Sequence, residues 1–590
     1  MSKYTIKFGD KEVEASPYQC EIFDNVEHGV GNMIIEAAAG AAKTTTIVNC
    51  MRFIPENKSI LFIAFNKDIV KAIKEKVGER KNTRISTFHS LGLAIFMENN
   101  KKNSDSININ EYKYKQYIKK NINDLTDYKE IKSLGSNKNT YINNINNLVE
   151  YSRYYLAFTE KQIKHVADKY GILCVRDEVK VCRKILKWGE DNIDTIDYTD
   201  MIWLPNVLNY NTKKYRYNWV MIDEAQDVTI AEEKLIEKTF KRGCRVIIIG
   251  DRFQTINIWA GSDEEAIDNF AKMPQTKHFT LPISYRCPKN IVNLAKKYSD
   301  NIVTADNAID GKVKFNVSKN LPTNGDMVLC RITAPLIDLH LHYMRINKKS
   351  YIRGYENIKE RYLNLVNATG SLTLDKDFNT VDGFFPSLYK MLLEQIDQVK
   401  KEFNLDDADA LMFPSILSLY DSIQGLKVMS EGITKVDELI DRINTVFSGN
   451  DKDAIQLSTV HKAKGLEADN VYILFPSLMP IKFAKKDWEL KTENNLIYVA
   501  ITRAKKTLNY IKEDNNDKAK IFSKSSIKTE LDRIRKSINY ISNIGIKEYK
   551  GGELNVGLKK LNVLGKRSKS SQPPKKKKPM SKFQKIINNK

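Results

Sequence analysis

Five short apolar runs, each ending in a polar or glycine turn, constrain the fold of this chain more than any other feature. Continuous apolar runs of this length are typical of strands buried on both faces of a parallel sheet. Helical patterns follow them, so the sequence predicts an α/β fold with ligand sites at the carboxyl ends of its strands. The runs are SILFIAFN (59–66), YNWVMIDEAQD (217–227), CRVIIIGD (244–251), DMVLCR (326–331) and DNVYILFP (469–476).

Two long polar segments with apolar residues at helical spacing separate the strand-rich regions. The 590 residues are too many for one hydrophobic core, so we expect two α/β cores, each interrupted by a helical insertion. The predicted segments are 1–90 and 195–275 for the first core, 91–194 for its insertion, 276–365 and 455–560 for the second core, 366–454 for its insertion, and 561–590 for a tail.

The charge of the chain indicates a polyanionic partner. The formal net charge is +22, and an excess this large is typical of proteins that bind nucleic acid. A lysine-rich coding bias is the alternative. Residues 566–590 carry ten Lys or Arg and no acid, which predicts a disordered tail. That tail is interpreted as a nuclear-import signal, a nucleic-acid anchor or a merely solvated end.

Location follows from what the sequence lacks. No apolar run approaches the roughly 18–20 residues that a membrane span needs, and the N-terminus has no signal pattern. We expect an intracellular protein without membrane contact, cytoplasmic unless the basic tail directs it to a nucleus. The seven cysteines are scattered without a CxxC pair, which favours a reducing compartment and argues against a zinc or iron–sulfur site.

The stretch EAAAGAAKTTT (36–46) follows the apolar residues MII (33–35) and precedes a helical pattern. A strand-to-helix turn of this kind binds phosphates through backbone N–H groups, a lysine and a hydroxyl on Mg²⁺. We expect Lys43 to contact the terminal phosphates of ATP and Thr44 to contact Mg²⁺. Alone the pattern is weak, because alanine occupies both usual glycine positions. The other predicted cradle residues are Ala37, Ala38, Ala39, Gly40, Ala41, Ala42 and Thr45.

Two further strand ends strengthen the prediction of a nucleotide site. In VMIDEAQD (220–227), Asp223 is placed to hold Mg²⁺ through water and Glu224 to orient and deprotonate the attacking water. In GDRFQ (250–254), Gln254 is placed to sense the γ-phosphate or its water. A DE pair at a strand end more commonly only caps the next helix, but the three segments together predict an ATP site.

In order along residues 14–510, this series of segments resembles the motifs of superfamily 1 helicases of the UvrD/Rep/PcrA type. The resemblance implies two RecA-like cores, each with a helical insertion, and ATP in the cleft between the cores. The segments that carry it, besides those of the nucleotide site, are SPYQCEIF (16–23), IAFNKDIVKAIKEKV (63–77), STFHSLG (86–92), IDYTDMI (196–202), IGDRFQTINIWAG (249–261), ISYRCPKNIV (283–292), LSTVHKAKGLEADNVYIL (457–474) and NNLIYVAITRAKKTL (494–508).

The resemblance also implies nucleotide contacts outside the loop. Gln19 matches the family's adenine-reading glutamine, Tyr285 its adenine-stacking tyrosine and Glu467 its nucleotide-site glutamate. Arg286 and Arg503 match arginine fingers supplied by the second core. Arginines that act across a cleft stabilise the transferring phosphoryl group only when the cleft closes, so the resemblance implies that hydrolysis is coupled to domain motion.

A groove for single-stranded nucleic acid is implied as well, in which cations contact phosphates and aromatic rings stack on bases. For Phe65 and Phe88 the alternative is core packing, and for His89 and His461 it is a plain polar role. The matched positions are Phe65, Asn66, Lys67, Phe88, His89, Trp259 and His461.

The function implied is an ATP-dependent DNA helicase that moves 3′-to-5′ on single-stranded DNA and unwinds tailed duplex in repair, replication or recombination. RNA stays open as a track. Ala42 and Asn257 depart from the family pattern, where glycine precedes the loop lysine and tyrosine stands in the coupling motif. The alternatives are a nucleic-acid-binding pseudo-enzyme without turnover and a nuclease–helicase fusion, for which no nuclease pattern follows residue 510.

Overall fold

A computed structural model of the protein describes most of the first 539 residues. In that part of the chain, every helix is too short or too polar to cross a membrane. The described residues are 4–8, 11–78, 80–101, 107–126, 138–170, 172, 174, 177–258, 261–263, 265–378, 383–403, 410, 414–447, 453–481, 487–513 and 529–539.

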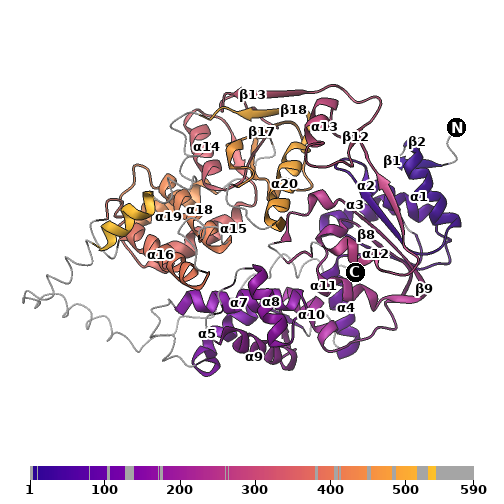
Figure 1. The fold of residues 1–590 in the computed structure, drawn as a ribbon, viewed down its shortest axis with the longest axis horizontal. Coiled ribbons are helices and arrows are strands. Elements are labelled where there is room, and N and C mark those ends of the chain that lie inside the picture. Colours follow the sequence, from indigo (N-terminus) through magenta and orange to yellow (C-terminus); the bar gives the residue numbers. More distant parts are fainter. Residues whose placement is uncertain are drawn as a thin grey trace, which may run out of the picture. The chain divides into compact units, whose positions relative to one another are not determined.

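The first sheet has six strands in the order β10-β3-β9-β8-β4-β5, and every neighbouring pair is parallel. Figure 1 labels its strands β8 and β9. Its edge strand β10 joins β3 although it lies beyond residue 275, where we expected the first core to end. The bounds are β3 (Met33–Ala37), β4 (Ile60–Ile63), β5 (Thr83–Ser86), β8 (Tyr217–Ile222), β9 (Phe240–Gly250) and β10 (Lys277–Leu281).

The second sheet also has six strands, in the order β13-β18-β17-β14-β16-β15, and its neighbours are again parallel. Its bounds are β13 (Lys312–Val317), β14 (Met327–Cys330), β15 (Ser350–Ile352), β16 (Ile455–Thr459), β17 (Ala468–Ile473) and β18 (Ala504–Ile511). The smaller two-stranded pairs are β1 (Thr5–Phe8) with β2 (Lys11–Glu14), β6 (Asn108–Ile109) with β7 (Thr195–Ile196), and β11 (Ile283–Ser284) with β12 (Val303–Thr304).

Strand β4 explains why the apolar runs carry no alternation. All four of its side chains are fully buried, but Ile60 and Phe62 pack into one hydrophobic cluster while Leu61 and Ile63 pack into another. Successive side chains of a strand point to opposite faces, so both faces of this sheet are covered by apolar layers. The first cluster continues into the second sheet through Met327.

Helices flank both sheets, as βαβ connections between parallel strands require. Those around the first sheet are α1 (Pro17–His28), α2 (Lys43–Cys50), α3 (Lys67–Val77), α4 (Phe88–Asn100), α10 (Tyr198–Val207), α11 (Ile230–Glu237) and α12 (Ala266–Ala271). Those that follow β11 are α13 (Lys289–Ala295), α14 (Ala334–Arg345), α15 (Tyr355–Thr369), α16 (Phe384–Phe403), α18 (Pro414–Met429), α19 (Val436–Val446) and α20 (Asp487–Ile501).

Short 3₁₀ turns end several strands and helices. They are η1 (Met51–Phe53), η3 (Ala225–Asp227), η4 (Arg252–Gln254), η6 (His461–Ala463) and η7 (Pro476–Leu478). Three of them, η3, η4 and η6, begin within three residues of the ends of β8, β9 and β16, so they lie at the carboxyl edges of the sheets.

The first insertion is a helical bundle tied to the first sheet by buried charges. Arg153 donates to both Asp197 and Asp200, and Lys113 donates to Asp200 at 2.7 Å. Asp197 caps α10, so this network fixes the start of α10 against the bundle. The bundle helices are α5 (Lys113–Leu125), α7 (Lys138–Tyr154), α8 (Glu160–Tyr170) and α9 (Glu178–Asp191).

The helical residues 529–535 pack against the second insertion. The Glu530 carboxylate accepts hydrogen bonds from the hydroxyls of Tyr389 and Tyr420 at 2.9 and 2.7 Å and pairs with Lys427 at 2.9 Å. Leu531 is fully buried beside it. This segment, which follows β18 in the chain, therefore contacts both α16 and α18.

The α/β fold class with two parallel sheets is confirmed. The domain boundaries stay predictions, although the pairing of β10 indicates that the chain leaves the first sheet only after Leu281. Trp259 and the basic tail at 561–590 lie outside the described residues.

Candidate functional site

The phosphate-binding loop connects β3 to α2 and uses its one glycine for a close approach. Gly40 has φ +75°, and a methyl group added there would lie 2.6 Å from Arg286 Cβ and 2.8 Å from Ser284 Oγ. The Gly40 carbonyl accepts the Tyr285 N–H at 3.0 Å. Glycine is therefore required at position 40 by both backbone angle and space.

Ala42, which stands where the family pattern has glycine, has a strained backbone conformation. It is the residue before α2 and adopts the left-handed conformation, with φ 58° and ψ 38°. For an L-residue with a Cβ this costs roughly 1–2 kcal/mol, and glycine avoids the cost. The loop keeps the left-handed geometry that a glycine would favour, even though alanine stands there.

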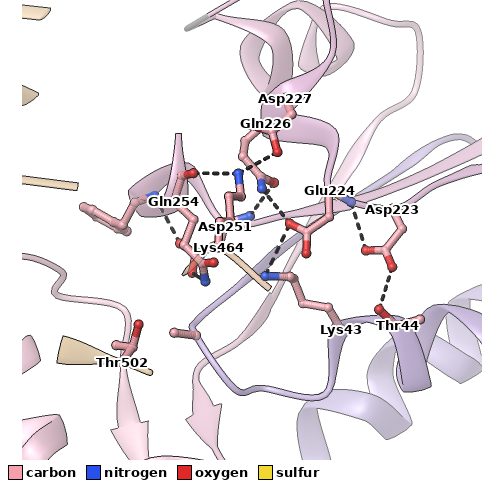
Figure 2. A network of polar contacts seen from close by, with 12 residues as sticks. Lys43, Thr44, Asp223, Glu224, Gln226, Asp227, Asp251, Gln254, Lys464 and Thr502 are labelled. Atoms are coloured by element: carbon pink, nitrogen blue, oxygen red, sulfur yellow. Dashed lines mark hydrogen bonds and ion pairs between the residues drawn. The ribbon is translucent and has the colours of Figure 1, made fainter. Parts of the chain in front are cut away.

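Thr44 and Asp223 meet at the start of α2, where the Thr44 hydroxyl donates to Asp223 Oδ2 at 2.6 Å (Figure 2). Burial, together with the neighbouring Glu224, raises the pKa of Asp223 to about 6. One hydroxyl and one carboxylate beside a phosphate loop form a donor set that suits Mg²⁺, which takes few protein oxygens and completes its shell with phosphates and water. The residues present thus fit the predicted metal site.

Glu224 is held in place for an ionised role. Its carboxylate accepts from Gln226 Nε2 at 2.6 Å and lies 3.7 Å from Lys43 Nζ (Figure 2). Burial alone would raise the pKa of Glu224, but Lys43 and Lys464 outweigh it and lower the pKa to about 2. Its backbone is also left-handed, with φ 54°. Strained residues of this kind cluster at active sites.

Lys464 brings a charge from the second sheet into this site. Its Nζ pairs with Asp227 Oδ2 at 2.5 Å and donates to the Gln254 carbonyl at 2.8 Å (Figure 2). The two charged side chains are 13% and 3% exposed. Asn257, which replaces the family's tyrosine, donates to the other oxygen of Asp227 at 3.2 Å. Asn257 therefore contributes a hydrogen bond to this polar network at the position where the family pattern has an aromatic ring.

The two predicted arginine fingers lie in different surroundings. Arg503 is buried in the turn between α20 and β18, where it donates to backbone carbonyls and reaches Gln254 Oε1 at 3.5 Å. Burial, with Arg286 nearby, lowers the pKa of Arg503 to about 10, which leaves it charged at neutral pH. Arg286 donates to Glu467 at 2.6 Å, so these two predicted site residues contact each other.

The two predicted adenine contacts differ in access. Tyr285 is 53% exposed, as a stacking ring must be. Gln19 is 1% exposed, its Oε1 accepts from the Ser16 backbone N–H at 3.0 Å, and its Nε2 donates to Thr46 at 2.9 Å. To read a base, the Gln19 amide has to leave these partners.

Three exposed ring-bearing residues lie on a loop and on helices that flank the first sheet. Phe65 follows β4 and is 56% exposed, and His89 follows the neighbouring strand β5. The His89 ring lies edge-on to Tyr198, 6.4 Å away, and Tyr198 is 53% exposed at the start of α10. Phe88 instead is 8% exposed and packs in the core, which is the alternative that its sequence context left open.

The remaining predicted nucleic-acid contacts lie at the start of α3 and in η6. Asn66 caps α3 by accepting the Ile69 N–H at 2.9 Å, which commits part of its side chain to the fold. Lys67 begins the same helix and is exposed. His461 lies in η6, and burial, with Arg331 nearby, lowers its pKa well below the usual range. A neutral His461 contacts a phosphate only as a hydrogen-bond partner.

Two family models match the chain over most of its described length. The UvrD/REP helicase N-terminal domain matches residues 19–275, and the UvrD-like helicase C-terminal domain matches residues 348–515. This chain belongs to the UvrD/Rep/PcrA-like superfamily 1 helicases. The activity of that family is ATP-dependent unwinding of DNA. The first match includes the phosphate loop, Asp223, Glu224 and Gln254, and the second includes Lys464 and Arg503, whereas Tyr285 and Arg286 lie between the two matches.

Similar proteins cover most of this helicase at low identity. The ATP-dependent DNA helicase PcrA of Staphylococcus aureus is 23% identical over 616 aligned residues, which cover 81% of this chain and 80% of the relative. The PcrA of Staphylococcus epidermidis is 22% identical over 614 residues and 81% of each chain. Among solved structures, the arterivirus nonstructural protein 10 helicase covers 85% of this chain and is itself covered to 63%, at TM-score 0.30 and 9% identity.

Four residues of the helicase site were missed by sequence reasoning. Gln226 lies inside the DEAQD segment and Lys464 inside the KGLE segment, but neither residue was assigned a role from the sequence. Tyr198 and Tyr498 lie in the segments IDYTDMI and NNLIYVAITRAKKTL. Tyr498 stands between Ile497 and Val499, so the sequence did not distinguish it from a core residue, whereas Tyr198 stands between the polar residues Asp197 and Thr199 and was not assigned a role.

The strain at Ala42 predicts the effect of restoring glycine. Ala42→Gly removes a left-handed alanine, so we expect a gain of about 1 kcal/mol in stability, with DNA-stimulated ATPase equal to or above that of the wild type. Thermal unfolding and steady-state ATPase measure both.

The matched control for that prediction is Ala41→Gly, one residue earlier in the loop. Ala41 is 1% exposed, and its backbone does not have a positive φ. Losing its methyl group therefore removes packing without relieving strain, and we expect destabilisation. Equal destabilisation by both substitutions would contradict the strain account.

Proposed function

We propose that this helicase hydrolyses ATP with Mg²⁺ and uses the energy to move 3′-to-5′ on single-stranded DNA and to unwind tailed duplex. The observation that carries the proposal is one network of charged and polar groups built from both sheets. Lys43, Glu224 and Gln254 come from the first sheet, while Lys464 and Arg503 come from the second. A network shared by two sheets rearranges when they move against each other, which links hydrolysis to movement.

The residues divide the hydrolytic chemistry among them. Lys43 binds the terminal phosphates, and Glu224, ionised because of its lowered pKa, orients the attacking water and accepts its proton. Arg503 supplies positive charge where negative charge develops on the transferring phosphoryl group. When bound at Thr44 and Asp223, Mg²⁺ supplies further neutralisation of the phosphates.

Gln226 has a supporting role in the same chemistry. Its Nε2 holds the Glu224 carboxylate, and its Oε1 accepts the Asp251 N–H at 3.0 Å. Glu224 is thereby fixed between the ends of β8 and β9. A base fixed in this way keeps its geometry during turnover, so less of the barrier is spent on orienting it.

For the track, we propose stacking of bases on the exposed rings of Phe65, Tyr198 and His89. Base stacking on an aromatic ring contributes roughly 1–3 kcal/mol per base and tolerates any sequence. The net charge of +22 favours a nucleic-acid partner through its phosphates. The 3′-to-5′ direction, the preference for DNA over RNA and a place in repair, replication or recombination are proposed by likeness to the family.

ATPase assays on the purified full chain test the hydrolytic site. We expect single-stranded DNA to stimulate ATP hydrolysis, and Glu224→Gln to lower kcat by about 10²- to 10⁴-fold, because the general base is lost. Lys43→Ala removes a phosphate contact and is expected to abolish turnover as well.

Glu237→Gln is the matched control, since Glu237 forms an exposed ion pair with Lys234 on α11. It is expected to keep wild-type kcat. A wild type that binds single strands but hydrolyses ATP no faster than Glu224→Gln would leave the pseudo-enzyme as the better account.

Unwinding of tailed duplexes tests direction and track. We expect strand separation with a 3′ single-stranded DNA tail and little with a 5′ tail. Replacing Phe65 and Tyr198 with alanine is expected to weaken single-strand binding by roughly tenfold or more for each lost stack. Unwinding only from 5′ tails, or only on RNA, would refute the proposed polarity or track.

A further inference from the structure

A buried tyrosine of the second sheet's helix α20 contacts the phosphate-binding loop directly. The Ala39 N–H donates to the Tyr498 hydroxyl oxygen at 2.9 Å, and both residues are fully buried. Ala39 lies in the loop after β3, and Tyr498 lies in the last turns of α20. This hydrogen bond therefore joins elements that are 459 residues apart in the chain.

The other side of the same hydroxyl faces the GDRFQ segment. Because Tyr498 accepts from Ala39, its own proton is free to point at Asp251 Oδ2, which lies 3.5 Å away. Asp251 Oδ2 also accepts from Gln254 Nε2 at 2.7 Å. Burial raises the pKa of Tyr498 well above its usual range, so the hydroxyl keeps its proton. One oxygen atom thus stands between the phosphate loop and Gln254.

Packing alone does not require this hydroxyl. The ring of Tyr498 lies in the core cluster and contacts Phe253, with ring centroids 6.0 Å apart, and a phenylalanine would fill the same space. Burying a hydroxyl is unfavourable unless it finds partners, and a buried N–H such as that of Ala39 also needs one. The tyrosine satisfies both needs at the junction of the two sheets.

We propose that Tyr498 is a positioning residue that ties the phosphate loop to Asp251 and Gln254, so that a shift of α20 moves the loop and the γ-phosphate sensor together. The inference deepens the proposed function and rests on it. Loss of the hydroxyl frees the loop from α20 while leaving Lys43, Thr44 and the packing of the ring in place. ATP then still binds, but its hydrolysis responds less to the track.

The test is Tyr498→Phe in the full chain, with Tyr343→Phe as the control. Tyr343 is a fully buried tyrosine of α14 whose hydroxyl donates to the Lys319 carbonyl at 2.6 Å, away from the loop. Tyr498→Phe is expected to speed amide hydrogen exchange of residues 38–42 without nucleotide. It is also expected to lower the DNA-stimulated kcat about tenfold, with KM for ATP within about threefold, as loss of one buried hydrogen bond implies.

The outcomes separate the two proposals. If the wild type shows no DNA-stimulated ATPase, the proposed function fails, and the exchange measurement still decides whether Tyr498 holds the loop. If the wild type is active and Tyr498→Phe keeps wild-type loop exchange and kcat, the proposed function stands and the positioning role is overturned. An equal loss of kcat in Tyr343→Phe would also overturn it, because any buried hydroxyl would then serve.

Discussion

The ion pair between Lys464 and Asp227 is the contact on which the assembled site depends. Taking two charges out of water costs several kcal/mol per ion, and their attraction offsets this only when further hydrogen bonds satisfy them. Here the Gln254 carbonyl accepts from Lys464 and Asn257 donates to Asp227. The pair is therefore favourable only when the segments that follow β8 and β9 and the turn η6 lie in these positions. The ion pair and its supporting hydrogen bonds are thus expected to form together.

The phosphate loop shows how few glycines such a site needs. Gly40 is indispensable because a Cβ at that position would clash with Arg286 and Ser284, whereas Ala42 tolerates a left-handed backbone at a cost of roughly 1–2 kcal/mol. The neighbouring Tyr285 N–H and Tyr498 hydroxyl hold the loop from outside. Contacts supplied by the rest of the protein thus maintain a conformation that the loop's own sequence disfavours.

Much of the fold could be predicted because parallel strands that are buried on both faces have continuous apolar sequences. Strands β4, β8, β14 and β17 lie where those runs stand, and the charged residues after β8 lie at its carboxyl end. Edge strand β10 escaped prediction because KHFTL is mostly exposed and carries no apolar run. Its parallel pairing with β3 is a tertiary fact that no local pattern encodes.

The site residues also divide into those that the sequence could predict and those that it could not. Lys43 and Thr44 were predictable from the loop between β3 and α2, and Asp223 and Glu224 because they directly follow β8; the structure brings the four together. Lys464 and Tyr498 were not, because their partners lie on the other sheet and depend on how α20 and η6 pack. Phe88 is the opposite case, because it matches a nucleic-acid contact of the family but its ring packs into the core.

A double-mutant cycle between Lys464 and Asp227 tests the central claim most directly. ATPase kcat/KM would be measured for Lys464→Met, Asp227→Asn and the double variant, each with saturating single-stranded DNA. If the pair closes the site as one unit, either single variant loses most of the activity and the second adds little, giving a coupling of more than about 1.5 kcal/mol. Additive losses would show that the two residues act independently and would contradict the account.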